Sequence, residues 1–238
     1  ATAVYGIGAL CSSTRVALEH MRSSQGLVMH PHPLQPYASQ LVDKLCSITM
    51  QEQQQPSNTS HYVAADRAIP VAALRALDAV LTASPASLFN NSLVHKVGNV
   101  LEMAGETLSL TAPETSLASW RRACCQTVGG CLGQVLEPVH GGDAAASVLN
   151  VDPIRALLRD SILPSLVTTA CQGRNKAKEN YSRDALALAC TFGLGASETI
   201  MTQLFQILSS ECTSDRVGVA EVASYILSQR SSFPAKAV

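Results

Sequence analysis

Hydrophobic residues recur along this chain at every third or fourth position, in stretches separated by polar or proline-containing segments. The clearest stripe runs from Tyr37 to Thr49 and consists of Tyr37, Leu41, Val42, Leu45, Cys46 and Thr49. This spacing places the residues on one face of a helix. No segment shows sustained alternation of apolar and polar residues, and no Asn-Gly or Asp-Gly hairpin signal occurs. The pattern therefore predicts an all-α fold.

Proline and capping residues punctuate the other predicted helices. Pro70 suits the first turn of a helix that ends at Ser84-Pro85, and Asp152-Pro153 is a strong helix start. We expect Pro164 to kink or split the helix that follows. Two longer helices are predicted, at about 87–108 and at 117–136.

The segment from Ser182 to Arg230 predicts three short helices with broad apolar faces. We expect Ser182 to cap the first, Ser197 the second, and Ser214 or Asp215 to start the third. The second helix carries a wide apolar surface made of Ile200, Met201, Leu204, Phe205, Ile207 and Leu208. Short helices with such faces need a further layer of structure before and after them.

Glycines in the helix predicted at 117–136 suggest close packing. Gly129, Gly130 and Gly133 lack side chains, so a neighbouring backbone could approach there.

Paired helices recur roughly every 40 to 50 residues, a spacing typical of two-helix repeats. Stretches such as DPIRALLRDSILPSLV and SDRVGVAEVASYIL begin with a helix start and continue with apolar pairs. In this pattern the chain resembles HEAT or armadillo-like repeats, over 70–108, 152–170 and 182–230. The resemblance implies an α-solenoid of stacked antiparallel helical hairpins.

Composition agrees with helix packing by small side chains. Of the 238 residues, 47% are hydrophobic but only 4% aromatic, and 15% are charged. We expect a single helical-repeat domain over 1–238, with possible sub-units 1–50, 61–140 and 143–238. The chain has no initiator Met, so we expect it to be a fragment of a longer one. The chain contains no run of 18 apolar residues, so the sequence predicts no membrane span.

The eight cysteines lie mostly at apolar helix positions, which predicts buried, reduced thiols and an intracellular protein, cytoplasmic or nuclear. Adjacent Cys124 and Cys125 do not have the spacing of zinc ligands, so no metal or other cofactor is expected. Three N-x-S/T triplets, at Asn58, Asn90 and Asn180, have no secretory signal to support them.

The sequence contains no complete catalytic motif among those considered. His140-Gly141-Gly142 faintly resembles an esterase oxyanion loop, but no G-x-S-x-G elbow or phosphate-binding glycine motif accompanies it. We therefore expect no enzymatic activity.

Basic residues form two small clusters in a chain whose net charge is −1. The candidate partner-binding residues are Trp120, Arg121, Arg122, Arg174, Lys176, Lys178 and Arg183. Trp120 is either a packing anchor or an interface residue. Without a large basic excess, nucleic-acid binding is possible but not indicated.

The sequence thus favours a non-enzymatic interaction scaffold or adaptor that binds other proteins within a multi-subunit complex. One alternative is an all-α enzyme or small-ligand carrier with an apolar pocket. A second is a nucleic-acid-binding helical repeat.

Overall fold

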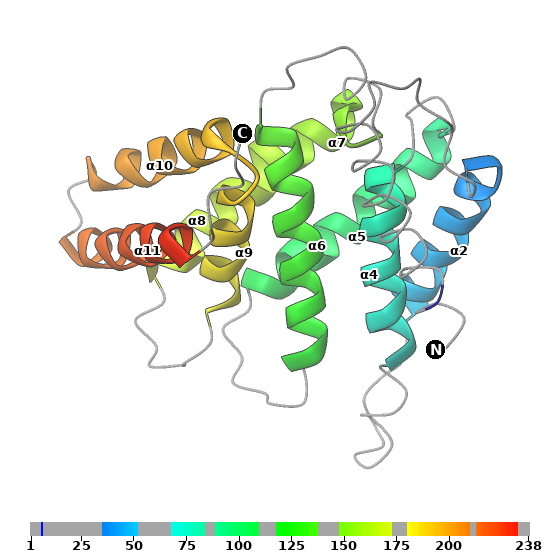
Figure 1. Ribbon diagram of the computed structural model, residues 1–238, viewed down its shortest axis with the longest axis horizontal. Helices are drawn as coiled ribbons and strands as arrows, with labels where there is room; N and C mark the ends of the chain where they lie inside the picture. Colours follow the sequence, from blue (N-terminus) through cyan, green and yellow to red (C-terminus); the bar gives the residue numbers. More distant parts are fainter. Residues whose placement is uncertain are drawn as a thin grey trace. The chain divides into compact units, whose positions relative to one another are not determined.

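The computed structural model describes residues 35–51, 68–83, 89–109, 118–137, 148–172, 180–209 and 213–232, together with Gly6. Every regular element in these ranges is helical, which confirms the predicted all-α class. The chain divides into two compact units. The first comprises residues 1–100 and 141–154, and the second comprises 101–140 and 155–238. Figure 1 labels the helices.

The first unit is built on the pairing of α2 with α4. A short 3₁₀ turn, η1 (Gln35–Tyr37), leads into α2 (Ala38–Gln51), and α2 packs against α4 (Ala68–Ala83). A second 3₁₀ turn, η6 (Val148–Asn150), also packs on α4. The buried side chains of this core include Val42, Leu45, Cys46, Leu74, Leu77, Leu81, Val97, Val148 and Leu149. The predicted stripe of α2 is thus largely confirmed, but Tyr37 is exposed because it precedes the α-helix.

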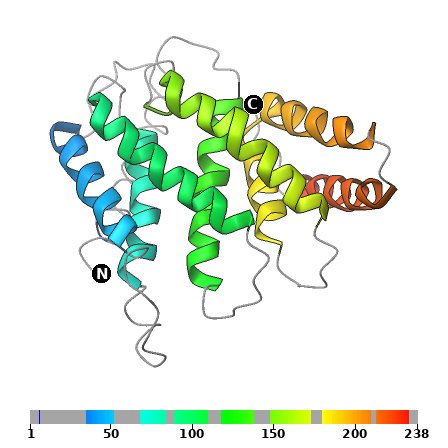
Figure 2. The same cartoon turned by 180° about the vertical axis from the view of Figure 1, so that it is seen from behind.

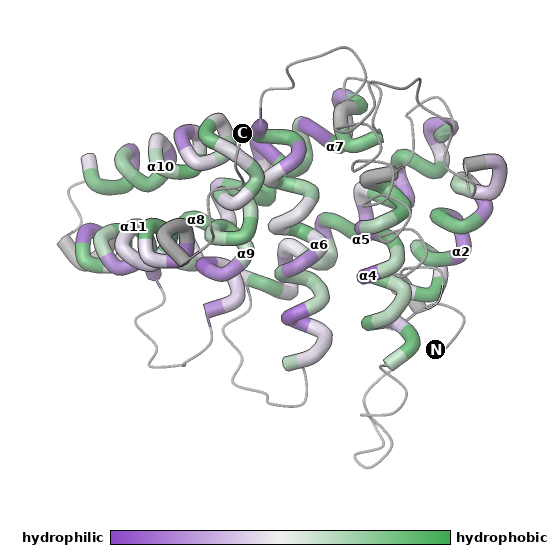
Figure 3. Tube along the Cα trace, in the orientation of Figure 1, coloured by the Kyte–Doolittle hydropathy of each residue, from purple (hydrophilic) through white to green (hydrophobic). Residues whose placement is uncertain are grey.

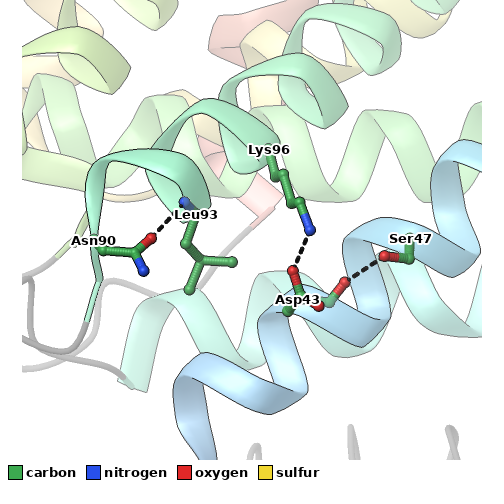
Figure 4. A network of polar contacts seen from close by, with 5 residues as sticks. All are labelled: Asp43, Ser47, Asn90, Leu93 and Lys96. Carbon is green, nitrogen blue, oxygen red and sulfur yellow. Dashed lines mark hydrogen bonds and ion pairs between the residues drawn. The ribbon is translucent and has the colours of Figure 1, made fainter.

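A local cap begins α5 (Asn91–Ser109), and an ion pair joins its first part to α2 within the first unit. Asn90 caps α5, since its Oδ1 accepts a hydrogen bond from the Leu93 N–H at 2.9 Å. One turn later, Lys96 forms an ion pair with Asp43 on α2, as Figure 4 shows. The hydrogen bond from Lys96 is the main reason that the pKa of Asp43 is lowered. The predicted start near residue 87 was too early, because Phe89 and Asn90 are not helical.

The second unit contains the rest of α5, from residue 101, and seven further helical segments, of which α7 contributes only its last residues. Their bounds are α6 (Ala118–Leu136), the end of α7 (Asp152–Ala156), η7 (Leu157–Ile162), α8 (Leu163–Gln172), α9 (Tyr181–Cys190), α10 (Leu194–Leu208) and α11 (Thr213–Ser232). The predictions for α6 and for the helix start at Asp152 are confirmed.

A π-helical turn accommodates Pro164. The six residues of η7 are wound as π-helix, and the Leu163 N–H donates to Leu158 O, five residues earlier. A proline inside an α-helix lacks an N–H and its ring would clash with the carbonyl four residues before it, here that of Asp160. The wider π turn avoids this conflict. Pro164 therefore changes the winding of a continuous helical segment and does not split it.

Two pairs of neighbouring helices in the second unit run in the same direction. Gly129 of α6 lies against Ala185 of α9, and Gly133 lies against Ala189, four residues further along each helix. Figure 1 shows α6 and α9 side by side, and both begin at the lower end of the view. In the same order, Gly105 of α5 meets Ile162 of η7, and Ser109 of α5 meets Ser165 of α8. Figure 2 shows the molecule from this side.

Candidate functional site

Glycines let α6 and α9 approach closely, as the sequence predicted for Gly129 and Gly133. A Cβ at Gly129 would lie 2.7 Å from the Ala185 carbonyl oxygen. A Cβ at Gly133 would lie 2.3 Å from the ring of Phe192, just beyond the end of α9. These distances are too short for real contacts, so the missing side chains set the position of α9 on α6.

The start of α9 is fixed by Asn180, not by Ser182 as predicted. Asn180 Oδ1 accepts the Arg183 N–H at 3.0 Å, and Asn180 Nδ2 donates to Ala170 O at 3.3 Å. Ser182 is buried, and its Oγ donates to Leu108 O at 2.9 Å. The serine therefore satisfies a carbonyl at the end of α5 and leaves the cap to asparagine.

Glu137, the residue directly after α6, caps α10, where the sequence predicted Ser197. Glu137 Oε2 accepts the Ala196 N–H at 3.1 Å. Its carboxylate occupies the space beside Gly193, where a Cβ would lie 2.1 Å from the carboxyl carbon. A negative charge at this end also suits the helix dipole. Ser197 lies inside α10, and its Oγ donates to Gly193 O and Cys190 O.

Arg183 belongs to a polar junction between α9 and α11. Its guanidinium lies 3.8 Å from the ring centroid of Tyr225, a cation–π contact, and 3.6 Å from Asp184 Oδ1. Burial, with a contribution from the Asp184 hydrogen bond, raises the pKa of Tyr225. Among the described residues, Arg183 Nε and Asp184 Oδ1 are buried without hydrogen-bond partners. Arg183 is thus held by its own chain.

Of the other predicted partner-binding residues, the structure describes Trp120, Arg121 and Arg122. Trp120 and Arg121 are buried in α6, and Arg121 lies 6.0 Å from the ring centroid of Tyr181. Arg122 is exposed. Arg174, Lys176 and Lys178 lie outside the described residues. Of the two roles considered for Trp120, packing anchor or interface residue, its burial agrees with the first.

Most of the exposed large apolar side chains belong to α10, to α11 and to the turn before α10. They are Phe192, Leu194, Phe205, Val217 and Leu227, whereas the rest of the described chain has only Tyr37 and Ile69. Leu194 is 71% exposed, and Phe205 is 55% exposed. Hydrophobic residues extend over most of α10 (Figure 3), but its fully buried large side chains are only Ile200 and Leu204.

One line of residues on α10, here called the outer seam, follows steps of four and three residues. It consists of Leu194, Glu198, Met201, Phe205 and Leu208. Leu194, Glu198 and Phe205 are exposed, and Met201 and Leu208 are half-buried. The sequence predicted a broad apolar surface here, but it did not show which part would remain in contact with solvent.

The six cysteines in the described ranges are all buried free thiols, as predicted for the cysteines of helical faces. They are Cys46, Cys124, Cys125, Cys131, Cys171 and Cys190. Burial raises the pKa of Cys46, Cys124 and Cys125 to about 12. In the described ranges, no group of three or more His, Cys, Asp or Glu side chains is placed to hold a metal ion.

None of the described helices is both long enough and apolar enough to cross a membrane. A scan against protein-family models, a search of curated proteins and a search of solved structures each found no match.

Proposed function

We propose that this chain is a non-enzymatic scaffold or adaptor that binds another protein, and that its helices form a HEAT/armadillo-like stack. The observation that carries the proposal is the concentration of exposed large apolar side chains between Phe192 and Leu227. Grouped apolar side chains on a surface are typical of protein interaction sites. Singly scattered ones, such as Tyr37 and Ile69 here, need no such explanation.

The directions of the helices support the stacked arrangement. In a two-layer solenoid, equivalent helices of successive repeats lie side by side in the same direction. The pairing of α6 with α9 has this geometry, and so has the pairing of the end of α5 with η7 and α8. Each pair joins helices that are separated in the chain by a helix of the other pair.

The mechanism requires only binding at a preformed surface. α10 packs on α6, α8, α9 and α11, and the Glu137 cap holds its first turn. A helix supported in this way loses little conformational freedom when a partner binds, which favours affinity. The partner would bury the apolar side chains that α10 and α11 leave exposed.

Affinity capture of the tagged protein from its own cells, under mild conditions, tests the proposal. We expect another protein to be recovered in a near-stoichiometric amount. The matched control is the doubly substituted protein Leu194→Ser, Phe205→Ser, which should lose that protein while remaining folded. Recovery of no stoichiometric protein would contradict the proposal. So would binding confined to nucleic acid at low salt or to a small apolar ligand.

A further inference from the structure

The outer seam has the spacing of a coiled-coil contact line. Its intervals of four, three, four and three residues are those between successive d and a positions of a heptad. Four of the five positions are apolar, and Glu198 is the only polar one. Such a line keeps to one side of a helix and suits a second helix lying along it.

The seam is separate from the side of α10 that holds the helix in its own fold. Ala196, Ile200 and Leu204 are fully buried and form the inward face. At 100° per residue, the centre of the outer seam is turned roughly 120° from the centre of that face. The apolar surface of α10 is therefore wider than the part of it that this chain buries.

We propose that the outer seam binds one amphipathic α-helix of a partner protein, and that this helix places a Lys or Arg side chain opposite Glu198. The inference rests on the proposed function and specifies the chemistry of the partner. α10 has 15 residues, so it offers a contact line about 22 Å long. A partner helix of about four turns would cover it.

Glu198 argues against a second copy of this chain as the occupant. If two copies of α10 paired in parallel, the two Glu198 carboxylates would face one another and repel. If they paired antiparallel about the midpoint between Met201 and Thr202, each carboxylate would lie level with the Phe205 ring of the other copy. Covering a carboxylate without a cation or hydrogen-bond donor is costly. A partner with a basic residue at this level avoids both costs.

A charge exchange on the intact chain tests the proposal. The probe is a fluorescein-labelled helical peptide of three heptads, with Leu at its a and d positions and Lys at the central a position. A second peptide has Glu at that position. We expect fluorescence anisotropy to show at least tenfold tighter binding of the Lys peptide, because like charges at such a contact repel.

The variant Glu198→Lys should reverse the preference between the two peptides. Glu221→Lys is the matched control, because Glu221 is also an exposed acid but lies on α11, and it should leave the preference unchanged. Phe205→Ser should weaken binding of both peptides at least tenfold, with the helical content by circular dichroism unchanged.

Three results would overturn the inference. The first is failure of either peptide to bind, and the second is a preference that Glu198→Lys does not reverse. The third is a dimer, detected by sedimentation equilibrium, that Phe205→Ser dissociates, because the occupant would then be a second copy. Any of these could occur while affinity capture still recovers a partner, so failure here is distinguishable from failure of the proposed function.

Discussion

At the residue scale, single side chains fix the starts of two helices in the second unit. Asn180 caps α9 and also holds Ala170 O, at the end of α8. Glu137 caps α10 from 59 residues away in the chain. Both residues therefore link two helices as well as satisfying backbone groups, which makes them sensitive points for stability.

Substitution of Asn180 tests this double role. Asn180→Ala removes the acceptor for the Arg183 N–H and the donor to Ala170 O, so we expect a loss of about 1–2 kcal/mol in the free energy of unfolding. Asn180→Asp keeps the acceptor and should lose less than the alanine variant. Urea denaturation measures both. Equal losses for the two variants would show that the cap itself contributes nothing.

Thiol titration gives a second prediction at this scale. With a pKa of about 12, Cys46, Cys124 and Cys125 remain protonated at pH 8, so iodoacetamide should not modify them in the folded protein. In urea all three should react. Modification of any of them at pH 8 without denaturant, located by peptide mass spectrometry, would contradict their burial.

The same pKa shift makes stability depend on alkaline pH. A cysteine in the unfolded chain loses its proton near pH 9, whereas the folded thiol keeps it up to about pH 12. Folding thus favours the protonated form. The contribution is complete below pH 9 and is lost as the pH rises from 9 towards 12. We expect the melting temperature to fall over that range, and Cys124→Ala should reduce the fall.

At the element scale, one backbone contact joins α11 to α8. A Cβ at Gly218 would lie 1.9 Å from the Cys171 carbonyl oxygen, closer than any side chain could fit. At Gly105 of α5 the nearest atoms belong to the Ile162 side chain, at 3.2 Å. A side chain can move aside more easily than a backbone carbonyl, so the two glycines should respond differently to the same change.

We expect Gly218→Ala to reduce the free energy of unfolding by about 3 kcal/mol, because α11 must move away from α8. Gly105→Ala should change it by less than about 1 kcal/mol, because a small clash with Ile162 is offset by the better helix propensity of alanine. Chemical denaturation of the two variants provides the comparison. A small effect at Gly218 would contradict the close approach of the two helices.

Features of the helices that depend on nearby residues could be predicted from the sequence, and features that depend on residues far away in the chain could not. The helix class, the α2 stripe, the extent of α6 and the packing role of Gly129 and Gly133 depend on local spacing, and the sequence predicted them. The cap of α10 comes from Glu137, 59 residues away, and the serine predicted to cap α9 is occupied by a distant partner. Ser182 has a good capping side chain, but its Oγ bonds to Leu108 O, 74 residues earlier.

The candidate surface was predictable only in part, for the same reason. The apolar width of α10 is visible in the sequence, but the division between its buried face and the outer seam depends on which neighbours pack against it. For Trp120 and Arg121 the sequence allowed a surface role that their burial does not support. They had the chemistry of an interface, yet the packing of the second unit buries them.

At the scale of the whole molecule, adjacent residues of α10 distinguish core from surface. Leu204 is completely buried and Phe205 is 55% exposed. We expect Leu204→Ser to cost about 3 kcal/mol or more, because it leaves a cavity and a buried hydroxyl. Phe205→Ser should change stability by less than about 0.5 kcal/mol, as surface substitutions usually do. Thermal unfolding measures both, and a large loss for Phe205→Ser would mean that its ring belongs to the core.

The Glu137 cap gives α6 a mechanical role. α6 contacts α9 through Gly129 and Gly133, and the carboxylate of Glu137, directly after α6, binds the first turn of α10. A pull on α10 is therefore transmitted along α6 as well as through the short turn at 191–193. α6 thus supports both α9 and α10, so a force applied at the first turn of α10 is shared with the other helices of the second unit.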